Sequence, residues 1–87
     1  MSEKVYITGA SSGIGAALAI EYAKRGATLG ISARRSEKLQ DIAQQCKVSG
    51  AADVFTYILD VTDQNNSAGT AKEFIAAANG IDIVIAN

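Results

Sequence analysis

Short apolar segments alternate with segments whose apolar residues recur at helical spacing. Four of the apolar segments are typical of strands: residues 5–7, 27–33, 54–59 and 81–85. Each of the first three is followed by a segment with helical periodicity. Strands that are almost entirely apolar, in the order β-α-β-α-β-α-β, predict an α/β fold. We expect one parallel sheet, buried on both faces and connected by right-handed crossovers.

Caps and stop residues delimit the three predicted helices. The first begins near Gly13 and ends before Gly26, and its predicted core face is Ile14, Ala17, Leu18 and Tyr22. The second is capped by Ser36 and ends at Gly50, with a core face of Leu39, Ile42, Ala43 and Cys46. The third is capped by Thr62 or Asp63 and ends at Asn79-Gly80, with a core face of Ala68, Ala71, Phe74, Ile75 and Ala78.

Composition excludes several classes of site. The 87 residues contain no His and one Cys, so the chain holds no His-based zinc site, no Ser-His-Asp triad and no internal disulfide. Eight basic and nine acidic residues give a net charge of −1, which provides no basic surplus for nucleic acid or an anionic membrane. With no long apolar segment at the N-terminus, we expect a cytoplasmic protein without a membrane span. Cys46, on a predicted core face, is interpreted as a packing residue.

A glycine-rich turn, Thr8-Gly9-Ala10-Ser11-Ser12-Gly13-Ile14-Gly15, joins the first strand to the first helix. Gly9 allows a sharp turn, Gly13 allows backbone to approach a pyrophosphate, and Gly15 allows the helix to pack closely on the sheet. The N–H groups and the positive end of the helix dipole would then face the phosphates. The hydroxyls of Ser11 and Ser12 add donors. No Gly-Lys-Ser/Thr follows, so this is not a Walker A loop.

These residues resemble the Thr-Gly-x-x-x-Gly-x-Gly signature of the short-chain dehydrogenase/reductase family. Asp60-Val61, after the third strand, is similar to the family's adenine-contacting Asp-Val pair, and Asn87 stands where its Asn-Ala-Gly motif begins. The resemblance spans the whole chain. It implies a Rossmann-type doubly wound sheet with strand order 3-2-1-4 and a nicotinamide dinucleotide cofactor. The implied cofactor-binding residues include Ile14 beside the three glycines.

The end of the second predicted strand bears on the choice between NADP and NAD. An acidic residue there would bind the adenosine ribose hydroxyls and repel a 2′-phosphate. This chain has Ser32-Ala33-Arg34-Arg35 instead, with Ala33 where NAD-preferring members usually carry the acid. A guanidinium binds phosphate through paired charge-assisted hydrogen bonds. We therefore expect NADP rather than NAD, bound by Arg34 and Arg35 with Ser32 near the ribose phosphate. The alternative is a solvent-exposed basic pair.

The family resemblance also implies residues that this sequence lacks. Members use a Ser, a Tyr and a Lys, assisted by an Asn, to move a proton while the nicotinamide moves a hydride. None of these matches a position here, and Tyr6, Tyr22 and Tyr57 are interpreted as packing residues because no Lys follows any of them by four positions. Members are typically about three times this length. We therefore expect the N-terminal piece of a longer reductase, inactive by itself.

Three functions remain open from the sequence. The first is the cofactor-binding half of an NADP-dependent oxidoreductase whose substrate is a small carbonyl compound or alcohol, and the resemblance implies a homo-oligomer. The second is a non-catalytic module that binds NADPH. The third is a Rossmann-type domain for another nucleotide ligand, such as S-adenosylmethionine, although that ligand has no phosphate for the two arginines.

Overall fold

The computed structural model describes residues 3–10, 13–59 and 64–86, without the side chains of residues 64–68. Strands and helices alternate strictly. They are β1 (Lys4–Ile7), α1 (Gly13–Lys24), β2 (Thr28–Ala33), α2 (Ser36–Ser49), β3 (Asp53–Ile58), α3 (Gln64–Ala78) and β4 (Ile83–Ile85). The predicted order of elements is confirmed. None of the described helices combines the length and apolar character needed to cross a membrane.

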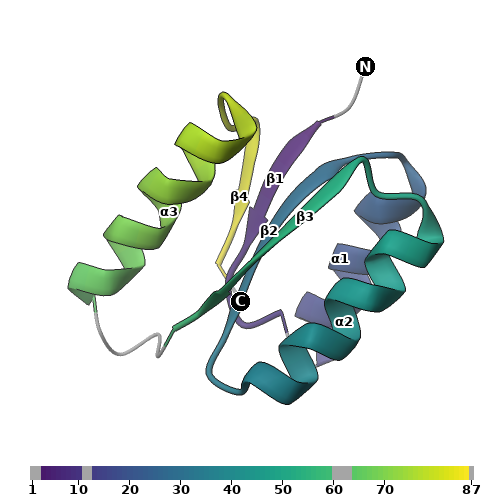
Figure 1. Cartoon of the computed structure of the whole chain (residues 1–87), viewed down its shortest axis with the longest axis horizontal. Coiled ribbons are helices and arrows are strands. Elements are labelled where there is room, and N and C mark those ends of the chain that lie inside the picture. Colours follow the sequence, from purple (N-terminus) through teal and green to yellow (C-terminus); the bar gives the residue numbers. More distant parts are fainter. Residues whose placement is uncertain (1–2, 11–12, 60–63, 87) are drawn as a thin grey trace.

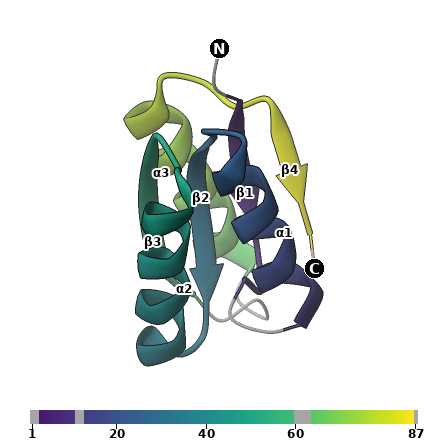
Figure 2. The ribbon, with the colours of Figure 1, turned by 90° about the vertical axis from the view of Figure 1, so that its right-hand side faces the viewer.

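All four strands form one parallel sheet in the order β3-β2-β1-β4, as the resemblance implied. Within the register, Ile7 lies beside Ile31 of β2 and Ile85 of β4. Helices α1 and α2 cover one face of the sheet and α3 covers the other (Figures 1 and 2). Because the strands are parallel, their carboxyl ends meet at one edge, where the turn after β1 and the loop after β2 lie near each other.

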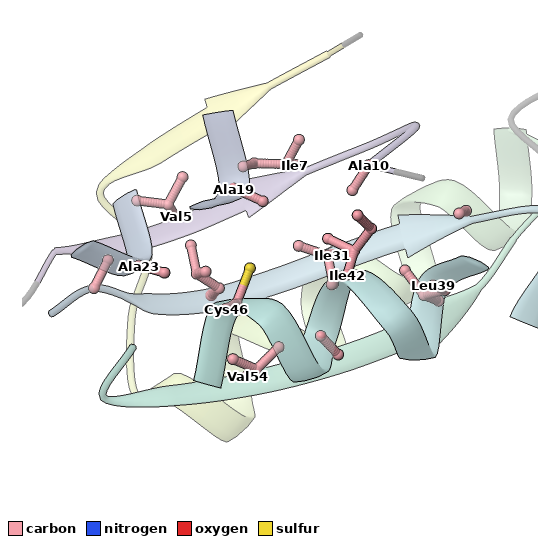
Figure 3. Packing of buried hydrophobic residues seen from close by; sticks show 14 residues of the cluster. Val5, Ile7, Ala10, Ala19, Ala23, Ile31, Leu39, Ile42, Cys46 and Val54 are labelled. Atoms are coloured by element: carbon pink, nitrogen blue, oxygen red, sulfur yellow. The ribbon is translucent and has the colours of Figure 1, made fainter. Parts of the chain in front are cut away.

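The main core lies between the sheet and the α1–α2 layer. Val5, Ile7, Leu29 and Ile31 are fully buried there, and Figure 3 shows Cys46 directed from α2 toward the strands. The predicted core face of α2 is confirmed, since its buried residues are Leu39, Ile42, Ala43 and Cys46. Burial also raises the pKa of the Cys46 thiol. This is the expected behaviour of a cysteine used for packing.

The predicted core face of α1 is wrong by about one position. The buried residues of this helix are Gly15, Ala19 and Ala23, whereas Ile14 is 72% exposed and Ala17 is also exposed. Leu18 and Tyr22 pack at the margin of the core as partly buried residues. Small side chains on the inner face let the helix axis approach the sheet, so the larger residues lie on its flanks.

Aromatic residues hold α3 against the opposite face. The Phe74 ring is fully buried and lies 5.6 Å from the Tyr6 ring and 6.2 Å from the Phe55 ring, measured between centroids. The Tyr6 hydroxyl is 2.7 Å from Thr70 Oγ1. At Gly30, a Cβ atom would come within 2.7 Å of Phe74 Cγ, so the absence of a side chain in the middle of β2 makes room for the ring. Of the predicted α3 face, Phe74 is buried, Ala71 and Ala78 are half-buried, and Ile75 is 40% exposed.

Most element boundaries agree with the sequence within one or two residues. The N-cap of α2 is Arg35, one residue before the predicted Ser36, and Arg35 makes no side-chain hydrogen bond to cap the helix. The predicted stop of α3 is confirmed, because Asn79 adopts a φ of 63° and Gly80 a φ of 135°. Lys4 then holds the start of β4, with its backbone N–H donating to Asp82 Oδ2 and its Nζ donating to Asn79 O, each at 2.8 Å.

Candidate cofactor-binding site

The turn after β1 has the backbone geometry that a phosphate cradle needs. Gly9 and Gly13 have φ values of 65° and 44°, a region that residues with a side chain rarely adopt. Helix α1 begins at Gly13, so its first N–H groups open onto the turn. A Cβ built at Gly13 meets no atom within 4 Å among the described residues, its neighbours along the chain and the backbone of its own helix aside, so there is open space beside this backbone.

Hydrogen bonds to two neighbouring strands hold the turn. The Thr8 N–H donates to Ile85 O of β4 at 3.0 Å, and the Ala10 N–H donates to Ser32 O of β2 at 2.9 Å. Ala10 is also fully buried. The turn is therefore held from both sides at the carboxyl edge of the sheet, which orients the start of α1 before any ligand is present.

In the first turn of α1, Gly15 is buried and Ile14 is exposed. Gly15 is buried on the inner face, in accordance with the prediction that it lets the helix pack closely. Ile14 is 72% exposed beside the glycine-rich turn, although large apolar side chains are usually buried. An apolar surface next to free backbone N–H groups suits a ligand that has both phosphates and flat rings.

The two arginines lie where β2 ends and α2 begins. Both Arg34 and Arg35 are exposed, and the described part of the chain shows no side-chain cap for the N-terminus of α2. Ala33, which precedes them, is buried and carries no charge. Two cationic side chains next to the positive end of a helix dipole make this corner favourable for an anion.

Ser32, predicted to lie near the ribose phosphate of the cofactor, is buried rather than exposed to a ligand. Its side chain is fully buried, and its hydroxyl has no hydrogen-bond partner among the described residues. Contact between this hydroxyl and a bound phosphate would require neighbouring groups to move. The predicted role of Ser32 near a ribose phosphate stays a prediction.

Five other predicted cofactor-binding residues lie outside the described part of the chain. They are Ser11, Ser12, Asp60, Val61 and Asn87. The described residues of the predicted site are brought to one edge of the sheet, with Gly9, Gly13 and Ile14 after β1 and Arg34 and Arg35 after β2.

Comparison with known proteins decides the family. A family model for short chain dehydrogenase matches residues 3–87. The chain belongs to this family. Among curated relatives, it is 37% identical over 84 residues to the hydroxysteroid 11-beta-dehydrogenase 1-like protein of Xenopus tropicalis. That match covers 97% of this chain but 29% of the relative, so this short-chain dehydrogenase chain spans less than a third of that relative's length.

Solved structures agree with the fold of this short-chain dehydrogenase chain. The apo-form glucose dehydrogenase of Caenorhabditis elegans superimposes with a TM-score of 0.88 at 32% identity, over 99% of this chain and 38% of the other. An NADH-dependent reductase complexed with NAD superimposes with a TM-score of 0.87 at 28% identity, over 99% and 36%. Nicotinamide cofactors are thus bound by proteins of this family that share the fold.

Sequence reasoning missed the residues that hold the turn in place. Thr8 and Ala10 act through backbone N–H groups, and a backbone donor leaves no trace in the residue type. The uncapped start of α2 was also missed, because Ser36 is a favoured cap residue by type. The partners of the Thr8 and Ala10 N–H groups are Ile85 and Ser32, which are remote in sequence, so these two contacts are visible only in the folded structure.

Proposed function

We propose that this chain is the adenosine- and pyrophosphate-binding part of an NADP-dependent oxidoreductase. The whole protein would transfer a hydride between NADP(H) and a small carbonyl or alcohol substrate. When bound, the nicotinamide supplies the hydride chemistry. The described residues would bind and orient the other half of the cofactor. The proton-transferring Ser, Tyr and Lys of the family would lie in the part of the protein that this chain does not span.

The described residues fit such a cofactor. The open backbone at Gly13 and the start of α1 supply N–H donors for the pyrophosphate, and the exposed Ile14 offers an apolar surface to a flat ring. The turn itself is already held by β2 and β4, so little ordering would accompany binding.

The observation that carries NADP over NAD is the basic corner after β2. Arg34 and Arg35 are both exposed at the N-terminus of α2, where the N-cap residue Arg35 makes no side-chain capping bond, and no carboxylate precedes them in the strand. A 2′-phosphate carries the charge that these groups favour. An adenosine with free ribose hydroxyls would gain much less from them.

Binding titrations of NADPH and NADH test this proposal. We expect Arg34→Ala to weaken NADPH binding by about 10- to 100-fold, the range for charge-assisted hydrogen bonds, and to change NADH binding by less than about twofold. Lys47→Ala is the matched control, because it removes the same charge from the opposite end of α2 and should alter neither affinity. Equal losses for both dinucleotides in Arg34→Ala would exclude a 2′-phosphate clamp.

A further inference from the structure

The outer edge of the sheet is formed by β3, and part of its backbone faces away from β2. The Leu59 N–H donates to Ala33 O of β2 at 2.8 Å. The N–H groups of every second residue counted from Leu59 therefore point toward β2. The Val54 N–H points the other way and is bonded by Asp53 Oδ1 at 2.9 Å. Because the direction of amides alternates along a strand, the N–H and C=O groups of Thr56 and Ile58 also point outward. Figure 2 shows β3 at the margin of the sheet with α3 behind it.

A groove of about 400 Å³ runs along this outward-facing part of β3. One wall is the second half of the strand and the other is one face of α3. Its described lining residues are Thr56, Tyr57, Ile58, Leu59, Gly69, Thr70 and Glu73. Among the described residues, the outward N–H and C=O groups of Thr56 and Ile58 have no partner along this groove. The Ile58 side chain, which is 64% exposed, lies at the same edge but on the α1–α2 face of the sheet, because Ile58 pairs with Ala33 of the main core. It lies outside the glycine-rich turn and the basic corner.

Gly69 lines the groove from α3 and has no side chain to fill it. Glycine inside a helix costs about 1 kcal/mol relative to alanine. A Cβ at this position would meet no atom within 4 Å, and its φ lies outside the left-handed region, so the described fold does not require a glycine here. The unused space lies on the groove side of α3. This contrasts with Gly30, where Phe74 fills the space.

The charge of the groove favours one kind of occupant. Glu73 is the only charged residue in the described lining. It lies near enough to Tyr57 to act, after burial and together with Tyr6, in raising the pKa of that phenol. A second copy of this chain would present another β3, which carries Asp53 and no basic residue, so it would bring no positive charge to Glu73. A strand with a basic side chain complements the groove.

We propose that the β3–α3 groove binds an extended peptide segment that carries a basic residue. The segment would add to the sheet as a fifth strand, with its backbone paired to Thr56 and Ile58. Because its side chains would alternate between the two faces, its apolar side chains would lie against Ile58 on the α1–α2 face and its basic side chain near Glu73 on the α3 face. Strand addition at a free sheet edge is an established way for proteins to bind peptides.

Nuclear magnetic resonance titration with defined peptides tests the site. The probe is a capped peptide of alternating Val and Thr with one central Lys, and its matched control has Glu in place of the Lys. We expect the Lys peptide to shift the amides of residues 54–59 and 69–73 and the Glu peptide to bind more weakly by about two- to fivefold, the range for an exposed ion pair. Absence of any shift with the Lys peptide up to about 1 mM would overturn the proposal.

Three variants separate the parts of the site. Thr56→Pro removes an outward donor, which an edge strand tolerates, and should lower affinity at least about tenfold. Gly69→Leu fills the groove, and should raise the melting temperature while abolishing binding. Glu73→Gln should remove the preference for Lys over Glu. All three should bind NADPH as the unmodified chain does.

The remaining outcomes each decide the question. If Thr56→Pro folds and binds the Lys peptide normally, strand addition is excluded. If Thr56→Pro does not fold, Gly69→Leu decides, and unchanged binding there overturns the proposal. A concentration-dependent dimer that Gly69→Leu abolishes would identify a second copy as the occupant and overturn the peptide assignment.

Discussion

Gly30→Ala should destabilise the fold because the new methyl group meets a ring that has no room to move. The built Cβ lies 2.7 Å from Phe74 Cγ and 2.9 Å from Cε1, and closer still to Cδ1, whereas real Cβ contacts below 3.0 Å are essentially unknown. Overpacking of this kind costs about 1–3 kcal/mol. Replacing glycine also restricts the unfolded chain, which offsets about 0.4–1 kcal/mol of that loss.

The net expectation is a loss of roughly 1 kcal/mol, and at most about 2.5 kcal/mol, in the free energy of unfolding, measured by urea denaturation with an unchanged m-value. In a chain of this size, each kcal/mol corresponds to about 4–8 °C in the melting temperature. The matched control is Gly69→Ala, the same chemical change on α3. Its Cβ meets nothing within 4 Å, so we expect it to stabilise the chain by up to about 1 kcal/mol.

A double mutant locates the cause of the loss. Phe74→Ala removes the ring atoms that block the Cβ, so Gly30→Ala should cost less in that background than in the unmodified chain, with a coupling of at least about 0.5 kcal/mol. If Gly30→Ala were as stable as the unmodified chain, or if the two changes were additive, the argument that Phe74 is seated on the bare strand would be refuted.

Three further changes have defined outcomes. Ser32→Ala removes a buried hydroxyl without a partner among the described residues, so urea unfolding should show equal or greater stability; a loss above about 1 kcal/mol would contradict this. Burial, then the charge of Glu73 and Tyr6, raises the pKa of Tyr57 in the folded chain above its ordinary value of 10.0. The contribution of the protonated phenol to the free energy of unfolding is therefore fully present below pH 10.0 and is lost as the pH rises through the pKa of the folded state. Tyr57→Phe should therefore flatten the fall in melting temperature above pH 10.0, and an identical fall in both proteins would refute the assignment. Asp82→Ala removes the acceptor of the Lys4 N–H and should lower the free energy of unfolding by about 0.5–1.5 kcal/mol. Asp82→Asn keeps an acceptor oxygen and should retain most of that stability. Equal losses in the two variants would mean that the charge of the carboxylate, rather than the hydrogen bond, stabilises the fold.

The order of elements was predictable because each strand is marked by its own run of apolar residues. The core face of α2 was predictable for a similar reason, since Leu39, Ile42 and Cys46 are large or apolar enough to dominate the periodicity. Helix α1 was harder. Its buried residues are Gly15, Ala19 and Ala23, and residues this small carry little hydrophobic signal.

The location of the candidate site was also predictable, because the glycine-rich turn and the arginines follow successive parallel strands. What could not be predicted depends on contacts between remote residues. Nothing local to Gly30 indicates that Phe74 will pack on it, and nothing local to Tyr6 indicates a hydrogen bond to Thr70. Nothing in the residues next to Ser32 along the chain indicates that its side chain is fully buried.

The position of β1 inside the sheet has a consequence during synthesis. Its neighbour β2 is complete at Ala33, but its other neighbour begins at Ile83, which is 83 − 33 = 50 residues later. At the rates typical of ribosomes, that interval is roughly 3–10 s. Throughout it, the second edge of β1 has no partner, although this strand carries Val5 and Ile7, two of the most deeply buried residues of the finished fold. The nascent chain therefore passes through a stage in which its central strand is an exposed, apolar edge, and this is when its association with other nascent chains or with chaperones is most favoured.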